Sequence, residues 1–166
     1  MLGDLIVRAT GGPPVTRFFK GVDMKFLVTD RLTIESGLLV RSAYIVISIH
    51  DPDKPKPRVK KQSGLRAVLQ LAFHDAEPAV SRVLPERIKL MTAEQAGQIR
   101  AFEEKHKDEV GAVVVHCEQG MSRSPAVAAA LCKRMGGDDR EFWEGYQPNG
   151  YVYRMVLEGG EKRIVS

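Results

Sequence analysis

The chain has 166 residues, which favours one domain, and its 43% hydrophobic content is typical of a globular protein rather than a disordered or fibrous one. Its 25 basic and 21 acidic residues give a formal net charge of +4, which suits anionic partners without singling out nucleic acid. Two cysteines are too few for a disulfide-stapled scaffold, and no apolar run is long enough for a membrane helix, so we expect a cytoplasmic protein without membrane insertion.

The first half of the chain predicts three strands separated by loops. Residues 1–23 contain Gly-Gly-Pro-Pro and no sustained period, so we expect an irregular N-terminal extension before a single domain at 24–166. Runs rich in β-branched and aromatic residues predict buried strands at 25–28, 43–49 and 65–73.

Two proline-containing segments are expected to be loops. Residues 51–61 carry three prolines and five basic side chains, which predicts an exposed loop that is either simply solvated or a rim that attracts anions. Residues 74–91, with Pro78 and Pro85, read as a long loop, and loops of that length are often functional.

The second half predicts helices around one central strand. Thr92 and Gln95 have the spacing of a capping box that opens a helix to about residue 108, and 112–116 is a short β-branched run expected to be a central strand. Ser124 can cap a following helix with Pro125 as its first residue.

Shorter helices follow. Gly136 and Gly137 should end the preceding helix, Asp138 or Asp139 can begin a short one, and Asn149 can cap a last helix at about 151–158. Strands alternating with helices predict an α/β fold, with a central, mostly parallel sheet of four to five strands covered on both faces.

The segment His-Cys-Glu-Gln-Gly-Met-Ser-Arg-Ser, residues 116–124, stands between the predicted central strand and a predicted helix. Free N–H groups of a tight loop that enters a helix N-terminus form a cradle for an anion such as phosphate. The same field favours the thiolate form of Cys117, which is the nucleophilic form of a cysteine. We call residues 117–123 the signature loop.

Two more residue types in this loop suit phosphate chemistry. Arg123 has a planar, permanently charged fork that can bind two phosphate oxygens at once. Gly120 lets the backbone adopt a positive φ or approach a ligand closely. The remaining N–H donors of the predicted phosphate site belong to Glu118, Gln119, Met121 and Ser122, and the Glu118 side chain is expected to point outward because its charge opposes an anion.

The pattern resembles the HCxxGxxRS loop of cysteine-based protein phosphatases, in particular small dual-specificity and tyrosine phosphatases of bacterial or phage type. The resemblance extends over about residues 25–157, although the loop alone is highly specific. It implies a hydrolase that needs no cofactor or metal and forms a phosphocysteine intermediate. Its implied substrate is a phosphorylated protein or peptide, with phosphotyrosine favoured over phosphoserine or phosphothreonine.

The resemblance also implies individual roles. Cys117 would be the nucleophile, Arg123 the transition-state clamp, Ser124 the hydroxyl that stabilises the departing thiolate, and His116 a supporting residue. An aspartate on another loop would protonate the leaving oxygen; Asp75 follows a predicted strand and is our first candidate, with Glu77 as a rival.

Several alternatives stay open. An inactive relative could bind phosphate without turnover, the substrate could be a phosphoinositide or an RNA 5′-phosphate, and a rhodanese-type sulfur transferase could use a similar loop. Cys132 lies within a predicted helix and is expected to be a core residue, with oxidation onto Cys117 as the other interpretation.

Overall fold

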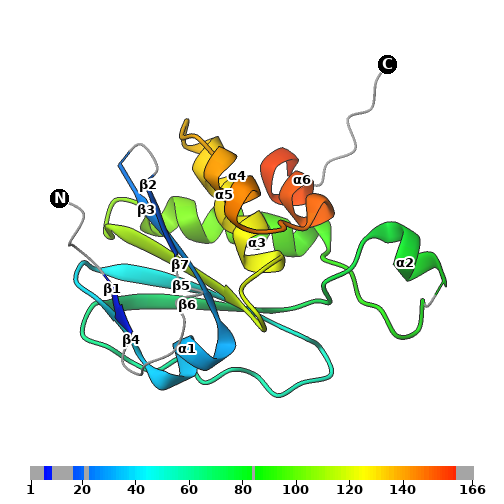
Figure 1. The fold of residues 1–166 in the computed structure, drawn as a ribbon, viewed down its shortest axis with the longest axis horizontal. Helices are drawn as coiled ribbons and strands as arrows, with labels where there is room; N and C mark the ends of the chain where they lie inside the picture. The colour runs from blue at the N-terminus through cyan, green and yellow to red at the C-terminus, as the bar shows by residue number, and fades with distance from the viewer. Residues whose placement is uncertain (1–5, 9–16, 21–22, 84, 160–166) are drawn as a thin grey trace.

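The computed structural model describes residues 6–8, 17–20, 23–83 and 85–159 (Figure 1). In chain order, the elements are β1 (Ile6–Arg8), β2 (Arg17–Lys20), β3 (Lys25–Asp30), α1 (Arg31–Ser36), β4 (Leu38–Val40), β5 (Tyr44–His50), β6 (Leu65–Ala72), α2 (Pro78–Val83), α3 (Ala93–His106), β7 (Ala112–Cys117), α4 (Arg123–Arg134), α5 (Arg140–Gly145) and α6 (Gly150–Glu158).

The central sheet has five strands in the order β2-β3-β7-β5-β6. The strands β3, β7, β5 and β6 run parallel, and β2 joins one edge in the antiparallel sense. Every residue of β5 and β7 is buried, as expected for strands covered on both faces. The predicted mostly parallel α/β sheet is therefore confirmed, with the strand before the signature loop at its centre.

The two faces of the sheet are covered differently (Figure 1). Helices α3, α4 and α6 lie on one face and enclose the larger apolar cluster, which includes Phe26, Ile47 and Leu131. The other face carries a smaller cluster in which Ile34 of α1 and Leu38 of β4 pack on strand residues. Long helices thus cover one face only, and short elements cover the other.

The structure corrects two of the segments that were expected to be irregular. Residues 6–8 and 17–20 form strands that pair with β4 and β3, so these parts of the expected irregular extension are regular; most of its other residues lie outside the described ones, and the boundary at residue 24 stays a prediction. The segment 74–91 contains α2, because Pro78 is acceptable at a first helical position. The sequence reading also missed α1, where the Asp30 side chain accepts a hydrogen bond from the Thr33 N–H.

The structure confirms two of the predicted helix caps. Thr92 and Gln95 form the full capping box of α3, and the Asn149 side chain caps α6. The exception is Ser124: α4 already begins at Arg123, so Ser124 lies inside the first turn and Ser122 holds the cap position without a side-chain bond. No helix in the described parts of the chain is long and apolar enough to cross a membrane.

Candidate active site

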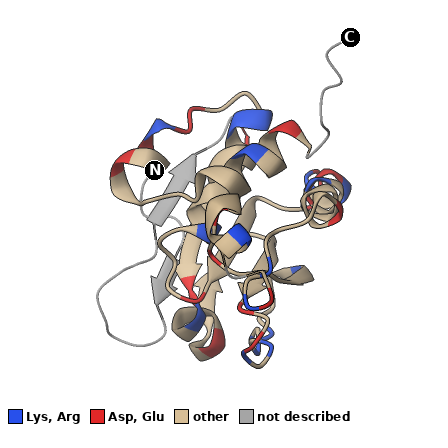
Figure 2. Ribbon diagram, turned by 90° about the vertical axis from the view of Figure 1, so that its right-hand side faces the viewer, with Lys and Arg blue, Asp and Glu red and all other residues tan. Residues whose placement is uncertain are grey.

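The signature loop lies at the carboxyl edge of the parallel sheet, between the end of β7 and the start of α4. Cys117 is the last residue of β7 and pairs in register with Asp30, the last residue of β3. Functional sites of open α/β sheets gather at this edge. Figure 2 views the molecule from this side.

Gly120 makes the tight shape of the signature loop feasible. Its φ is 73°, and a Cβ added there would lie 2.8 Å from the Thr29 carbonyl oxygen. Nearby, the Arg31 N–H donates to the Glu118 carbonyl at 3.3 Å. The loop is therefore packed against the junction of β3 and α1, and only glycine fits at position 120.

The Cys117 sulfur lies at the base of the loop and accepts a hydrogen bond from the Gly120 N–H at 3.2 Å. The Ser124 hydroxyl is also 3.2 Å from the sulfur. Cys117 is only 2% exposed, so a reactant must enter the loop to reach it. Across the described residues, no hydrogen bond involves the N–H groups of residues 118–119 and 121–123, which remain available to an anion.

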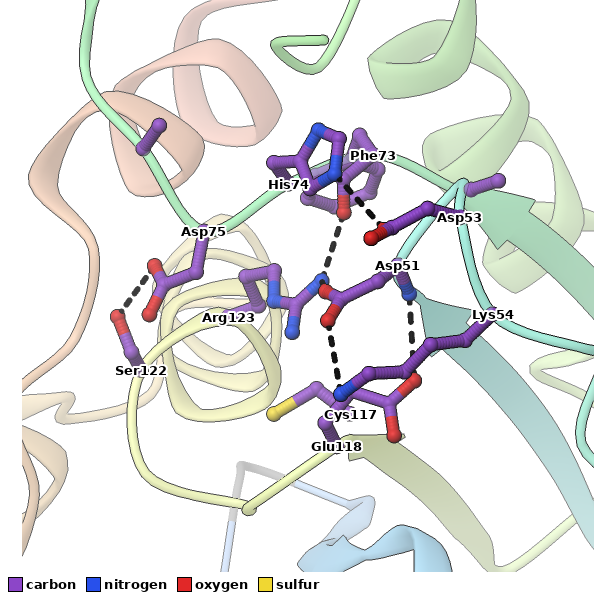
Figure 3. Close-up of polar contacts among 12 residues, drawn as sticks. Asp51, Asp53, Lys54, Phe73, His74, Asp75, Cys117, Glu118, Ser122 and Arg123 are labelled. Carbon is purple, nitrogen blue, oxygen red and sulfur yellow. Dashed lines mark hydrogen bonds and ion pairs between the residues drawn. The ribbon is translucent and has the colours of Figure 1, made fainter. Parts of the chain in front are cut away.

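Arg123 is held from one side. Its Nη1 group donates to the Phe73 carbonyl at 2.6 Å and lies 2.7 Å from Asp51 Oδ1 (Figure 3). Its Nε group is buried and has no partner within the described part of the chain. Because Nη1 is anchored, the edge formed by Nε and Nη2 is left to present parallel donors to an oxyanion.

Asp51 is the residue that braces Arg123. It follows β5 directly, and its Oδ2 atom also pairs with Lys54 Nζ at 3.1 Å. Burial alone would raise the pKa of the Asp51 carboxyl, but the charges and hydrogen bonds of Arg123 and Lys54 lower it below its usual value. Asp51 is therefore ionised at neutral pH and balances the buried guanidinium.

Asp75 lies beside the signature loop (Figure 3). Its Oδ1 atom accepts hydrogen bonds from the Ser122 hydroxyl at 2.8 Å and from Asn149 Nδ2 at 2.9 Å. Both bonds reach the same oxygen, and Oδ2 accepts no hydrogen bond from the described residues. Its rival Glu77 is exposed and lies near Gly150 at the start of α6.

Asn149 connects three segments. Its side-chain oxygen caps α6, its Nδ2 group donates to Asp75 and to the Ala76 carbonyl, and its backbone N–H donates to the Ser122 carbonyl at 3.0 Å. One buried side chain thus fixes the Asp75 loop relative to the signature loop.

His116 is fully buried, and burial lowers its pKa to about 4. Its Nδ1 atom is 3.3 Å from the Cys117 carbonyl, which can only accept, so Nδ1 carries the proton. Its Nε2 atom then accepts from the Ser48 hydroxyl at 2.6 Å. The neutral ring orients the backbone next to Cys117 and contributes no positive charge.

The expected outward position of the Glu118 side chain is wrong. The side chain is only 11% exposed, and its Oε1 atom accepts from Arg31 Nη1 and from the Asp51 N–H, both at 3.2 Å. It points toward the start of the β5–β6 loop, where Arg31 offsets its charge. Glu118 therefore joins the signature loop to the segment that carries Asp51.

Cys132 is buried in α4, and burial raises the pKa of its thiol. Ser124, whose hydroxyl lies 3.2 Å from the Cys117 sulfur, precedes Cys132 by eight positions on α4. This is roughly 12 Å along the helix axis, which is too far for a disulfide with Cys117 without unfolding α4. The structure favours the core interpretation.

Sequence reasoning missed the supporting contacts of Asp51, Ser122 and Asn149. Asp51 had a usable signal, since an acidic residue directly after a buried parallel strand lies at the same edge as the signature loop. The sequence predicted Asn149 as a helix cap but gave no sign of its place in the site. Its contact with Asp75 joins residues 74 positions apart and leaves no local pattern.

The arrangement of elements is similar to that of two solved phosphatase structures. Tk-PTP in its active form aligns with a TM-score of 0.51 and 19% identity over 92% of this chain and 100% of that chain. A mouse putative dual specificity phosphatase, crystallised with zinc tungstate, aligns with a TM-score of 0.50 and 20% identity over 92% and 90% of the two chains. The chain has the fold of the tyrosine and dual-specificity phosphatases.

The scan of protein-family models found no match to the sequence, and neither did the search of curated proteins. At 19–20% identity, the likeness to solved phosphatases extends to the fold. The case for an activity in this phosphatase fold therefore depends on the chemistry of its own side chains.

Proposed function

We propose that the chain is a phosphomonoester hydrolase that uses no metal, acting as a protein tyrosine or dual-specificity phosphatase. The observation that carries the proposal is the state of Arg123, whose Nη1 is anchored by Asp51 and Phe73 while its buried Nε has no partner among the described residues. A buried donor without a partner is costly, and an oxyanion in the signature loop would satisfy it.

In the first step, the Cys117 thiolate attacks phosphorus and the bond from phosphorus to the leaving oxygen breaks. Asp75 gives its proton to that oxygen. Arg123 and the loop N–H groups bind the phosphoryl oxygens, so they stabilise the charge that builds up in the transition state. The product of this step is phosphocysteine plus the free alcohol or phenol.

In the second step, water attacks the phosphocysteine and Asp75, now ionised, takes a proton from it. The sulfur leaves as thiolate, and the Ser124 hydroxyl at 3.2 Å can donate a hydrogen bond to it. Free phosphate is released, and the starting state is restored, because Cys117 is again a thiolate and Asp75 holds the proton taken from water. The position of Asp75 beside Ser122 supports hydrolysis over binding without turnover.

Hydrolysis of an aryl phosphate with an uncharged aryl group, in the presence of a chelator, tests this proposal. The wild type should release phosphate, Cys117→Ser should be inactive, and Asp75→Asn should be slower by roughly 10²- to 10⁴-fold. Activity that survives in Cys117→Ser would overturn the mechanism. Phosphate binding without turnover in the wild type would show a binding module instead.

A further inference from the structure

The loop between β5 and β6 presents three cations on one side. In its stretch 56–60, Pro57 is buried and Val59 packs against the smaller apolar cluster, while Lys56, Arg58 and Lys60 are exposed. This alternation is that of an extended chain with one face on the protein. We call Lys56, Arg58 and Lys60 the basic row.

The backbone under the basic row is fixed to the body of the protein. Gln70 Nε2 donates to the Pro57 carbonyl at 2.8 Å, and the Arg58 N–H donates to Glu35 Oε1 at 3.3 Å. Prolines at 55 and 57 further restrict the chain. Alternate residues of an extended chain are about 6.6 Å apart, so the three charges have a set spacing.

The basic row starts next to the candidate active site. Lys54, two residues before Lys56, pairs with Asp51, which in turn braces Arg123 (Figure 3). From there the row runs along α1, where the Lys60 N–H lies 3.5 Å from the Ile34 carbonyl. A ligand anchored in the signature loop could therefore reach the row with its adjoining part.

The charges of the basic row are not neutralised by the protein. In the described ranges, none of the three side chains forms an ion pair, whereas the nearby carboxylates Asp51 and Glu118 are paired with Lys54, Arg123 and Arg31. A row of unpaired cations beside a phosphate-binding loop attracts a ligand with further negative charge.

We propose that the basic row binds acidic residues at alternate positions of an extended phosphopeptide whose phosphorylated residue occupies the signature loop. The inference rests on the proposed phosphatase function and specifies its substrate class. An extended peptide repeats same-side residues at about 6.6–6.8 Å, which matches the spacing of the row.

A peptide fits this surface better than a single-stranded nucleic acid. Binding of single strands relies on aromatic side chains on which bases stack. Trp143 is the one exposed aromatic residue in the described ranges, and it lies on α5, which packs with α4 on the opposite face of the sheet. The basic row has no stacking platform beside it.

The test compares kcat/KM for matched phosphotyrosine peptides. One peptide carries glutamates at three alternate positions and the other carries glutamines there, with the series placed on either side of the phosphotyrosine. For one of the two placements we expect about a tenfold preference for the acidic peptide at low salt. The preference should vanish near 1 M salt, where the screening length falls to about 3 Å.

The variant Lys56→Ala/Arg58→Ala/Lys60→Ala should lose this preference, while its hydrolysis of an aryl phosphate with an uncharged aryl group stays unchanged. The matched control, Lys105→Ala/Lys133→Ala/Arg154→Ala, removes the same charge from exposed positions of α3, α4 and α6 and should keep the preference. The salt series on the wild type checks the same claim without any substitution.

Two results would overturn the inference and leave the proposed function intact. One is equal turnover of acidic and neutral peptides by an enzyme that hydrolyses the aryl phosphate. The other is a loss of turnover in the row variant that is confined to a 5′-phosphorylated oligonucleotide, which would indicate nucleic acid as the ligand. Failure to hydrolyse the aryl phosphate at all would instead contradict the proposed function.

Discussion

Arg123 owes its orientation to two acceptors that lie outside the signature loop, the Asp51 carboxylate and the Phe73 carbonyl. In Asp51→Asn the shape is kept and the charge is lost, so the guanidinium is held less firmly. Small misplacements of a clamp are costly, and we expect kcat/KM for an aryl phosphate to fall roughly 10- to 100-fold.

Asp108→Asn, at an exposed position after α3, provides the control for lost negative charge. It should leave turnover unchanged. Wild-type turnover by Asp51→Asn would show that the Phe73 carbonyl alone orients Arg123.

Asn149 combines a stability role and a positioning role that two substitutions can separate. Asn149→Ser keeps an N-cap oxygen for α6 but removes the amide donor to Asp75, so unfolding should change little while turnover falls. Asn149→Ala also loses the cap, which should lower the free energy of unfolding by about 1 kcal/mol. Urea unfolding and kcat, measured on both variants, check this prediction. Full activity of Asn149→Ser would show that the Asn149 amide does not position Asp75.

These residues show which parts of the site a sequence can reveal. The residues of the signature loop are contiguous, so one short motif and its place between a strand and a helix identify them. The partners Asp51 and Asn149 lie outside the signature loop, next to β5 and α6, and the fold brings them to it. The place of Asp51 directly after a buried strand indicates the correct edge of the sheet, but its contact with Arg123 and the contact of Asn149 with Asp75 depend on strand order and helix packing, which no local pattern encodes.

At the scale of elements, the buried strands were predictable because β-branched runs such as β5 and β7 carry their own signal. Short elements were not. The six residues of α1 and of α2 are too few to show helical periodicity, and proline at the start of α2 suggested a loop. Strands β1 and β2 depend on their partners β4 and β3 rather than on a pattern of their own.

Helix α2 has no buried residue and projects from the body in Figure 1. Two hydrogen bonds close the base of the loop that carries α2. The His74 N–H donates to the Lys89 carbonyl at 2.7 Å, and the Lys89 N–H donates to His74 Nδ1 at 3.0 Å. Replacing residues 78–87 with a short Gly-Ser linker should therefore change the free energy of unfolding by less than about 1 kcal/mol.

The shortened chain should also hydrolyse an aryl phosphate normally, because Asp75 and its two hydrogen-bond donors are retained. Thermal unfolding and steady-state kinetics provide the measurement. A large loss of stability would mean that α2 packs on the body in solution.

For the molecule as a whole, burial of His116 makes stability depend on pH. Its pKa is about 4 in the folded protein against 6.5 ordinarily, so the unfolded chain takes up the proton first as pH falls. Titration of His116 therefore leaves the free energy of unfolding unchanged above about pH 6.5. Below that pH it lowers the free energy of unfolding increasingly, by about 3 kcal/mol in total at pH 4. Burial also lowers the pKa of His50, which acts in the same direction.

The variant His116→Asn isolates this effect, because an amide can still donate to the Cys117 carbonyl but does not titrate. Urea unfolding between pH 7 and pH 4 should show a smaller loss of stability in the variant than in the wild type. Parallel curves for the two proteins would mean that His116 is not buried as a neutral ring.

The measurement that tests the account most directly is rapid acid quenching of the protein during turnover of an aryl phosphate, followed by mass spectrometry of its peptides. In the wild type we expect one phosphoryl group on the peptide that contains Cys117. In Asp75→Asn the phosphorylated peptide should accumulate to larger amounts where hydrolysis of the intermediate slows more than its formation. In Cys117→Ser we expect no phosphorylated peptide. Rapid turnover by the wild type with a phosphoryl group on another residue, or continued turnover by Cys117→Ser, would contradict the mechanism.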